Sequence, residues 1–194
     1  MPPKVKITKE DIIRTAVDLV RQRGIDAINA RAIATALSCS TQPIFSNFAT
    51  MDDLLYDVLE AAQQCCIEYM EREVASGRYP AYKANGMAYI RFAKEEKELF
   101  KLLYMRDRRT ETFAENRVLT DQMEALVQQY TGLEGDDIAL FHLEMWACVH
   151  GIAVMFATSY LDLDWELVSK MITDVYQGLR HRYGMEDSNG SHPH

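Results

Sequence analysis

Apolar side chains recur every three or four positions along most of this sequence, a spacing that gathers them on one face of an α-helix. No stretch alternates apolar and polar residues for long enough to form a strand, and few Gly or Pro residues interrupt the helical pattern. The pattern predicts helices over residues 8–24, 29–37, 42–47, 50–75, 82–94, 97–105, 112–130, 136–158 and 164–182. We therefore expect an all-α protein of about nine helices.

Residues at the predicted helix ends support these boundaries. Thr8, Asn29 and Ser40 can each cap a helix start, because their side chains accept hydrogen bonds from free backbone N–H groups. Thr50 precedes two aspartates, and acidic residues in a first turn interact favourably with the helix dipole. Gly24 ends the first helix. The first 50 residues are thus predicted to hold three helices ahead of a long fourth one.

Charge is distributed unevenly over the 194 residues. The chain has 21 Lys and Arg against 29 Asp and Glu, a net charge of −8, which at first argues against nucleic acid as a partner. Residues 1–48, however, carry seven bases and four acids, a net of +3, and the remainder carries a net of −11. Such asymmetry indicates a nucleic-acid-binding module attached to an acidic second part.

The sequence lacks the motifs of several other classes of protein. It contains no Gly-rich phosphate loop, no zinc-protease His pair and no Cys-x-x-Cys, so we expect no enzyme activity, no catalytic residue, no metal and no cofactor. The N-terminal residues lack the apolar stretch that export needs, which predicts a cytoplasmic protein. Residues 138–157 are strongly apolar, but Glu144 near their middle is costly in a bilayer, and we expect no membrane association.

The segment 29–47 has the lengths of a helix-turn-helix: a short helix, the turn 38–40 and a second short helix. Such a motif places small and polar side chains of its second helix against base edges in the major groove. Ser40, Thr41 and Gln42 supply the start of that helix, and Ser46 and Asn47 continue its exposed side. Spacing alone leaves an ordinary buried three-helix core as an equal alternative.

Residues 8–59 resemble the N-terminal DNA-binding domain of TetR-family transcriptional regulators. Four stretches at consistent spacings carry the resemblance: residues 8–24, Asn-Ala-Arg-Ala-Ile-Ala at 29–34, Ser-Thr-Gln-Pro-Ile-Phe-Ser-Asn-Phe at 40–48, and Met-Asp-Asp-Leu-Leu at 51–55. Phe45 and Phe48 fill the aromatic-x-x-Phe pattern of the family's recognition helix. The resemblance implies a DNA-binding domain over 1–50, a ligand-binding and dimerisation domain over 51–183 that begins with a linking helix, and a flexible tail over 184–194.

The resemblance also implies which residues meet double-stranded DNA. They combine bases that neutralise phosphates with recognition-helix groups that reach base edges. The expected contacts are Lys4, Lys6, Lys9, Arg31, Ser40, Thr41, Gln42, Phe45, Ser46, Asn47 and Thr50. Three positions depart from the family's usual residues: Ser38 replaces a common Gly, Phe45 a common Tyr and Met51 a common Lys. The last two changes remove phosphate donors and are expected to weaken backbone affinity.

In the same family the remaining helices bind an effector. Here the segment Trp-Ala-Cys-Val-His-Gly at 146–151 resembles a Trp-x-x-x-His-Gly motif of one C-terminal subgroup, and Trp146 and His150 lie on one helical face. A buried His bonded within the core is the alternative to a ligand contact. The residues expected to line a small-molecule pocket are Phe92, Leu103, Tyr104, Phe113, Met123, Trp146 and His150. Plain core packing is the alternative for the whole set.

The last two predicted helices carry apolar stripes suited to a four-helix bundle between two subunits. The expected interface residues are Phe141, Met145, Cys148, Ile152, Phe156, Leu167, Met171, Val175 and Leu179. A dimer has a physical reason, because two helix-turn-helix units must reach half-sites about 34–36 Å apart on one face of DNA.

These features together predict a ligand-responsive, homodimeric DNA-binding regulator. In this family it is most often a repressor that binds a palindromic operator and is released by a small-molecule effector. Two alternatives remain open. One is a regulator that senses thiol oxidation through Cys65 and Cys66, and the other is a helical enzyme without a recognisable motif.

Overall fold

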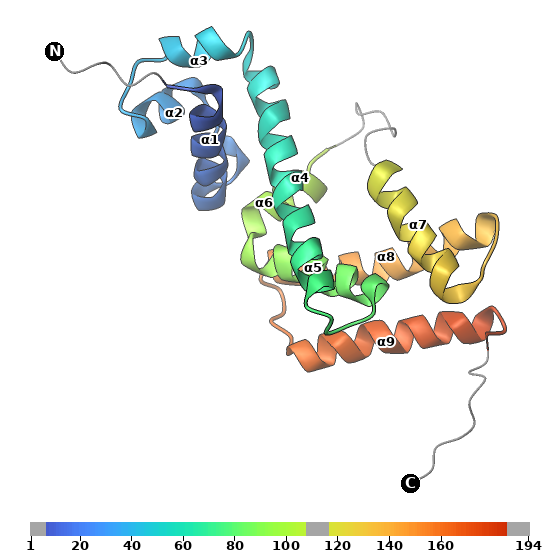
Figure 1. Cartoon of the computed structure of the whole chain (residues 1–194). Coiled ribbons are helices and arrows are strands. Elements are labelled where there is room, and N and C mark those ends of the chain that lie inside the picture. Colours follow the sequence, from blue (N-terminus) through green and yellow to red (C-terminus); the bar gives the residue numbers. More distant parts are fainter. Residues whose placement is uncertain (1–6, 108–116, 186–194) are drawn as a thin grey trace. The chain divides into compact units, whose positions relative to one another are not determined.

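The computed structural model describes residues 7–107 and 117–185 (Figure 1). Over these ranges the chain forms α-helices and one short 3-10 helix and contains no strand, which confirms the predicted all-α class. The elements are α1 (Lys9–Arg23), η1 (Ile25–Ala27), α2 (Ala30–Ala36), α3 (Gln42–Asn47), α4 (Met51–Ala75), α5 (Ala81–Glu95), α6 (Lys97–Tyr104), α7 (Arg117–Thr131), α8 (Asp136–Ala157) and α9 (Trp165–Arg182). Each predicted helix has a counterpart among them, while residues 112–116 of the predicted seventh helix and residues 186–194 of the predicted tail lie outside the described residues.

The chain divides into two compact units. The first, which we call the head unit, comprises residues 7–69 and 92–107, and the second, the body unit, comprises 70–91 and 117–185. Helices α4 and α5 each contribute to both units, so the division runs through these helices.

Local hydrogen bonds explain where the helices of the head unit begin. The Thr8 hydroxyl accepts from Asp11 N and the Asp11 carboxylate accepts from Thr8 N, a capping box that Thr50 and Asp53 repeat at α4. Asn29 caps α2 through a 2.9 Å bond from Ala32 N. These caps agree with the predicted ones.

The predicted Ser40 cap is wrong. The residue before α3 is Thr41, and it makes no side-chain cap bond. Pro43 lies in the first turn and has no N–H group, so fewer free backbone donors remain for a side-chain cap to satisfy.

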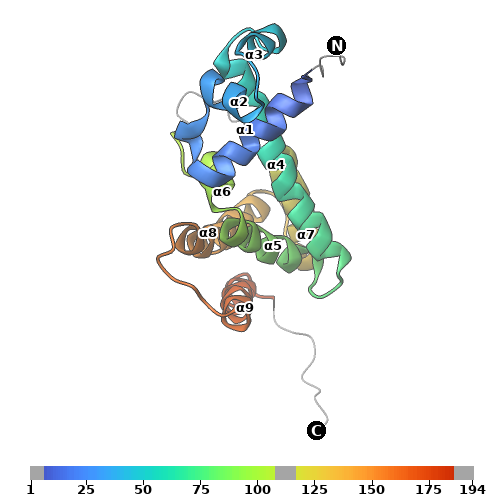
Figure 2. The same ribbon diagram turned by 90° about the vertical axis from the view of Figure 1, so that its left-hand side faces the viewer.

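The head unit has a continuous apolar core. α1 packs against α2, α3 and α6, and Figure 2 shows α1, α2 and α3 grouped beside the first half of α4. The buried residues at the centre are Ile12, Ala16, Val20, Ile33, Ile44, Phe48, Leu54, Val58, Leu99 and Phe100. Because α3 is fixed to this core by buried side chains, its opposite side is held in a defined orientation within the head unit.

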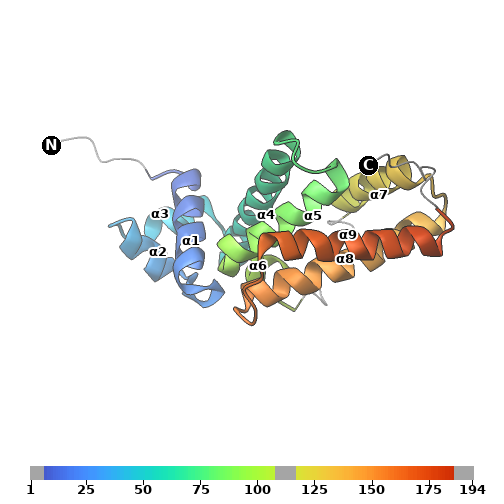
Figure 3. The ribbon, with the colours of Figure 1, turned by 90° about the horizontal axis from the view of Figure 1, so that it is seen from below.

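The body unit is built on α8. Helix α8 packs against α7 and α9, and α8 and α9 lie side by side in Figures 1 and 3. The buried side chains of α8 are Phe141, Met145, Val149, Ile152, Ala153, Phe156 and Ala157. At Gly86 of α5 an added Cβ would lie 3.3 Å from Val149 Cγ2, so α5 lies close against the same helix.

Among the described residues, α8 is the one helix whose length and composition would allow it to cross a membrane. This is weak evidence for a span, since the central helix of a soluble protein meets the same criteria. Glu144 on α8 pairs with Arg182 of α9, and one side of α8 is buried within the body unit. These contacts fit a helix packed inside an α-helical domain.

Candidate nucleic-acid interface

Helices α2 and α3 and the turn between them form the helix-turn-helix. Ile33 and Ala34 of α2 and Ile44 of α3 are buried, which fixes both helices to the head unit. In the turn, Ser38 has a φ of 53°, and Cys39 N donates to Ala34 O at 2.9 Å. The left-handed backbone explains why glycine is common here, because other residues adopt this conformation at a cost.

The side of α3 opposite Ile44 is exposed. Gln42, Phe45, Ser46 and Asn47 are all exposed, and 54% of the Phe45 surface is accessible. The structure thus places these predicted contacts on one short helix, with Ser40 and Thr50 exposed at its two flanks and Thr41 half-buried. Phe48, by contrast, is buried, and so the two aromatic residues of the pattern have different roles.

Several polar side chains near α3 already donate hydrogen bonds within the protein. Ser46 Oγ donates to Gln42 O at 2.9 Å, and Asn47 Nδ2 donates to Pro43 O at 2.7 Å. Thr50 Oγ1 belongs to the α4 capping box. The exposed Gln42 amide has no such bond within the described structure, which leaves it the most available polar group on α3.

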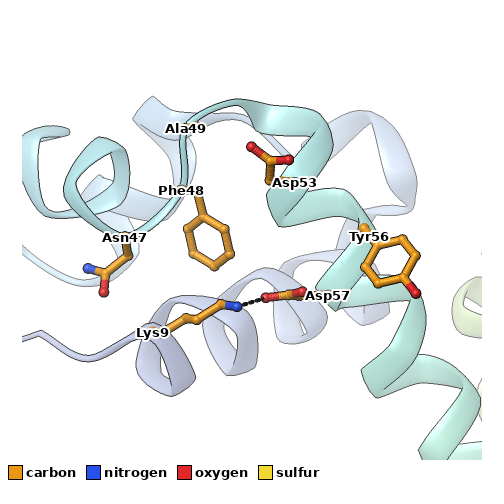
Figure 4. A pocket seen from close by; sticks show the side chains of 7 residues that line it. All are labelled: Lys9, Asn47, Phe48, Ala49, Asp53, Tyr56 and Asp57. Atoms are coloured by element: carbon orange, nitrogen blue, oxygen red, sulfur yellow. Dashed lines mark ion pairs between the residues drawn. The ribbon is translucent and has the colours of Figure 1, made fainter.

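The predicted phosphate contacts differ in their surroundings. Lys4 and Lys6 lie outside the described residues. Arg31 is exposed and forms no ion pair with the described part of the chain. Lys9 Nζ lies 2.6 Å from Asp57 Oδ2 and 5.3 Å from the centroid of the Phe48 ring (Figure 4).

The hydrogen bond to Asp57 raises the pKa of Lys9 above its ordinary value. Lys9 thus links α1 to α4 through an ion pair, and a contact with phosphate would have to replace this pair. This pair could not be predicted from the sequence, since its members lie 48 positions apart.

A shallow, open pocket of about 310 Å³ surrounds the same ion pair. Figure 4 shows its lining, which consists of Lys9, Asn47, Phe48, Ala49, Asp53, Tyr56 and Asp57. Two carboxylates and one ammonium give the lining an acidic balance, which does not attract phosphate. Among the predicted contacts that the structure describes, Arg31 and the exposed side chains of α3 other than Asn47 lie outside this acidic lining.

The residues predicted to line one effector pocket are divided between the two units. Phe92 and Leu103 are buried in the head unit, where the Tyr104 hydroxyl donates to Cys66 Sγ at 3.7 Å. Phe113 lies outside the described residues. The remaining three, Met123, Trp146 and His150, belong to the body unit. The first group is packed as core of the head unit, and no pocket within either unit brings the whole set together in the described structure.

His150 has protein partners on two sides. Its ring stacks on Trp146 with 4.6 Å between centroids, and Nδ1 lies 3.0 Å from Tyr89 Oη. A second pair repeats this arrangement on α8, with Tyr82 Oη 3.1 Å from His142 Nδ1. Burial lowers the pKa of both histidines. The bonded His150 agrees with the alternative interpretation of a core histidine, and the Tyr–His pairs were not predicted.

The predicted dimer residues all belong to the body unit, and all but one are buried or half-buried. Four of them are buried in their own chain, which leaves them little surface for a partner: Phe141, Met145, Ile152 and Phe156. Cys148, Met171, Val175 and Leu179 are half-buried, and Leu167 is exposed. The large apolar side chains that α8 exposes are Leu140, Leu143 and Trp146.

The two adjacent thiols have surroundings that disfavour reactivity. Cys66 is buried, and burial raises its pKa to about 12. Cys65 is half-buried, and burial raises its pKa also, although Arg21 Nη2 lies 3.7 Å from its sulfur. Because the thiolate is the reactive form, neither group supports the thiol-sensing alternative. Within the described ranges no group of three or more His, Cys, Asp or Glu residues is placed to hold a metal.

An anchored α3 with an exposed, partly polar side, carried by an all-α chain with a second helical unit, defines a helix-turn-helix transcriptional regulator. Comparison with known proteins agrees with this class. Residues 82–175 match the family model of the tetracyclin repressor-like, C-terminal domain. In this part the chain is therefore similar to TetR-family regulators, which bind DNA to control transcription and are not enzymes.

Solved structures share the fold over most of the chain. A TetR-like transcriptional regulator from Rhodococcus sp. RHA1 has a TM-score of 0.64 and 15% identity, with 94% of this chain and 97% of that chain covered. A TetR-family member from Streptomyces coelicolor has a TM-score of 0.64 and 19% identity, covering 86% and 96%. A TetR-family regulator from Mesorhizobium loti has a TM-score of 0.62 and 14% identity, covering 90% and 95%. No curated protein matches the chain.

Proposed function

We propose that the protein is a cytoplasmic homodimeric repressor whose two head units bind the half-sites of a palindromic operator. A small-molecule effector bound by the body units releases it. The observation that carries the proposal is the structure of α3, which is anchored by Ile44 while Gln42 and Phe45 remain exposed on its other side. This is the arrangement that a recognition helix needs in order to enter the major groove.

Arg31 supplies a positive charge for the DNA backbone. It is exposed on α2, and in the described structure no carboxylate competes for its guanidinium. Arginine binds phosphate oxygens through a planar set of donors. We propose that Arg31 fixes the position of the head unit on the duplex while α3 contacts the bases.

The dimer is proposed to form through the exposed side of α8 together with α9. Leu140, Leu143 and Trp146 follow one another at three-residue spacing and are 40%, 57% and 41% exposed. Leu167 adds an exposed apolar side chain on α9. An apolar surface of this kind on a helix is expected to be covered by a partner. A second copy of the chain suits it, because a symmetric operator requires a symmetric protein.

The effector acts in this proposal by a difference in affinity. A ligand shifts a protein between two arrangements only when it binds one of them more tightly than the other. Release from the operator therefore requires that the effector prefer an arrangement of the dimer in which the two head units do not match the half-sites. The chemical class of the effector is not assigned.

The test begins with selection of DNA duplexes from a random library by the full-length protein, followed by footprinting of the selected sequence. The expected result is a palindromic site whose affinity falls steeply with salt concentration, because phosphate contacts release counterions. Selection of no such site would refute the proposal.

A pair of matched variants tests the role of Arg31. Arg31→Ala is expected to reduce the slope of log affinity against log salt by about 0.9 for each half-site. Arg23→Ala serves as the control, because Arg23 is also exposed and has no ion pair with the described residues. It lies at the far end of α1 from Lys9, about 20 Å along the helix. Equal slopes for the wild type and Arg31→Ala would remove Arg31 from the interface.

A further inference from the structure

Phe45 is a large aromatic side chain that the structure leaves exposed to solvent. More than half of its surface is exposed, although the other aromatic residue of α3's pattern, Phe48, is almost fully buried. The neighbouring Ile44 already provides the anchor of α3 in the core. Phe45 is therefore not needed to hold the helix in place, and its exposed ring is available to a ligand of the head unit.

The polar side chains beside Phe45 limit what else this surface can recognise. Ser46 and Asn47 each donate one hydrogen bond to the carbonyl four residues earlier in α3. Gln42, which lies three residues before Phe45 and thus on the same side, keeps its amide free within the described structure. The exposed side of α3 thus combines one free amide with one large apolar ring.

These two groups match the two bases of an A·T pair as they are presented in the major groove. A glutamine amide can bind adenine N6 and N7, and an apolar side chain such as phenylalanine can pack on the C5 methyl of thymine. A phenyl ring lacks a hydroxyl and cannot donate to a phosphate oxygen, so the base edge is its more favourable partner.

We infer that Phe45 reads the C5 methyl group of a thymine in each half-site of the operator. The inference rests on the proposed function, since it requires that α3 enter the major groove. It goes beyond that function because it assigns one chemical group of one base to one side chain, and it makes Phe45 a determinant of sequence specificity.

Uracil substitution tests this contact directly, because uracil differs from thymine only by the missing methyl group. In the operator selected by the full-length protein, each thymine is replaced by uracil in turn, and affinity is measured by fluorescence anisotropy. At one position per half-site the substitution is expected to weaken binding about fourfold, the value of one buried methyl group, and about 15-fold when both half-sites are changed. Uracil at flanking positions outside the footprint is expected to have no effect.

Variants of the protein connect the effect to Phe45. Phe45→Ala is expected to bind the thymine and uracil operators equally, whereas Phe45→Leu keeps an apolar side chain and part of the discrimination. Tyr56→Ala removes a ring of similar exposure from α4 of the same unit and is expected to retain the wild-type ratio. Thermal unfolding shows that each variant is folded.

The outcomes separate this inference from the proposed function. If the protein selects an operator but no thymine is sensitive to uracil, or if Phe45→Ala still discriminates fourfold, the inference is overturned while DNA binding stands. Discrimination that survives in Phe45→Ala would assign the methyl contact to another side chain, such as that of Thr41. If no duplex is selected at all, DNA binding fails, and the thymine contact fails with it.

Discussion

The proposed dimer depends on apolar side chains that α8 exposes, and Leu143 is the most exposed of them, with 57% of its surface accessible. Burying a whole leucine side chain contributes about 2.5 kcal/mol, so covering the exposed part of Leu143 contributes about 1.4 kcal/mol per subunit. In a two-fold symmetric interface the same residue contributes twice. Since alanine keeps part of the side chain, Leu143→Ala is expected to cost about 2 kcal/mol, which weakens the dimer about 30-fold.

Sedimentation equilibrium over a range of protein concentrations measures this change in the dimer Kd. The control is Ile25→Ala, which removes an apolar side chain of comparable exposure (42%) from η1 in the head unit. It is expected to leave the dimer unchanged. Urea denaturation of the monomer shows whether Leu143→Ala alters folding. An unchanged dimer Kd for Leu143→Ala would refute the assignment of this side of α8 to the interface.

Three further predictions concern single residues. Ser38→Gly is expected to raise the free energy of unfolding of the head unit by about 0.5–1 kcal/mol, because relief of the left-handed backbone outweighs the entropy of glycine; a lower urea midpoint would contradict this. Burial lowers the pKa of His142 below 6.5, so the unfolded chain binds the proton first and stability falls as the pH drops below 6.5. Thermal unfolding from neutral to mildly acidic pH measures that loss, and His142→Gln should reduce it; an equally steep loss would count against His142. Lys9→Met breaks the ion pair with Asp57 and is expected to destabilise the head unit while leaving the salt slope of operator binding unchanged, whereas a reduced slope, as for Arg31→Ala, would make Lys9 a phosphate contact.

The helices and most of their caps could be predicted from the sequence, because both depend on residues a few positions apart. The capping boxes at Thr8 and Thr50 have their partners three residues away, and the apolar stripe of α1 repeats with the helical period. The Ser40 prediction failed for an equally local reason. Pro43 removes one of the backbone donors that a cap would satisfy, and the residue before α3 is Thr41, which makes no side-chain cap bond.

The functional surfaces were harder to predict, because they depend on contacts between distant parts of the chain. Helix α8 is apolar on more than one side, so periodicity could not separate the buried Phe141 from its exposed neighbour Leu140. The pairing of Lys9 with Asp57 and of His150 with Tyr89 also requires the tertiary fold. Phe45 and Phe48 show the same limit: one pattern contains both, yet only the fold decides which one is exposed.

The charge of the first 48 residues, which carry the helix-turn-helix, bears on the kind of DNA affinity that we expect. Residues 1–48 carry a net charge of +3, but three of their bases are already paired. These pairs are Lys9 with Asp57, Arg14 with Asp11, and Arg21 with both Asp18 and Glu96. Because non-specific affinity follows the number of phosphates neutralised, we expect operator binding to depend more on the fit of α3 and on the joining of two half-sites.

Weakening the dimer and weakening the phosphate contact should consequently have different signatures. Leu143→Ala is expected to lose operator binding at protein concentrations below its raised dimer Kd and to recover it at higher concentrations, because each dimer, once formed, has intact head units. Arg31→Ala is expected to remain weaker at every concentration, with a smaller salt slope. Titration of both variants at two salt concentrations distinguishes these cases. If Leu143→Ala fails to recover while sedimentation shows it dimeric, α8 affects the head units in some way other than through dimer formation.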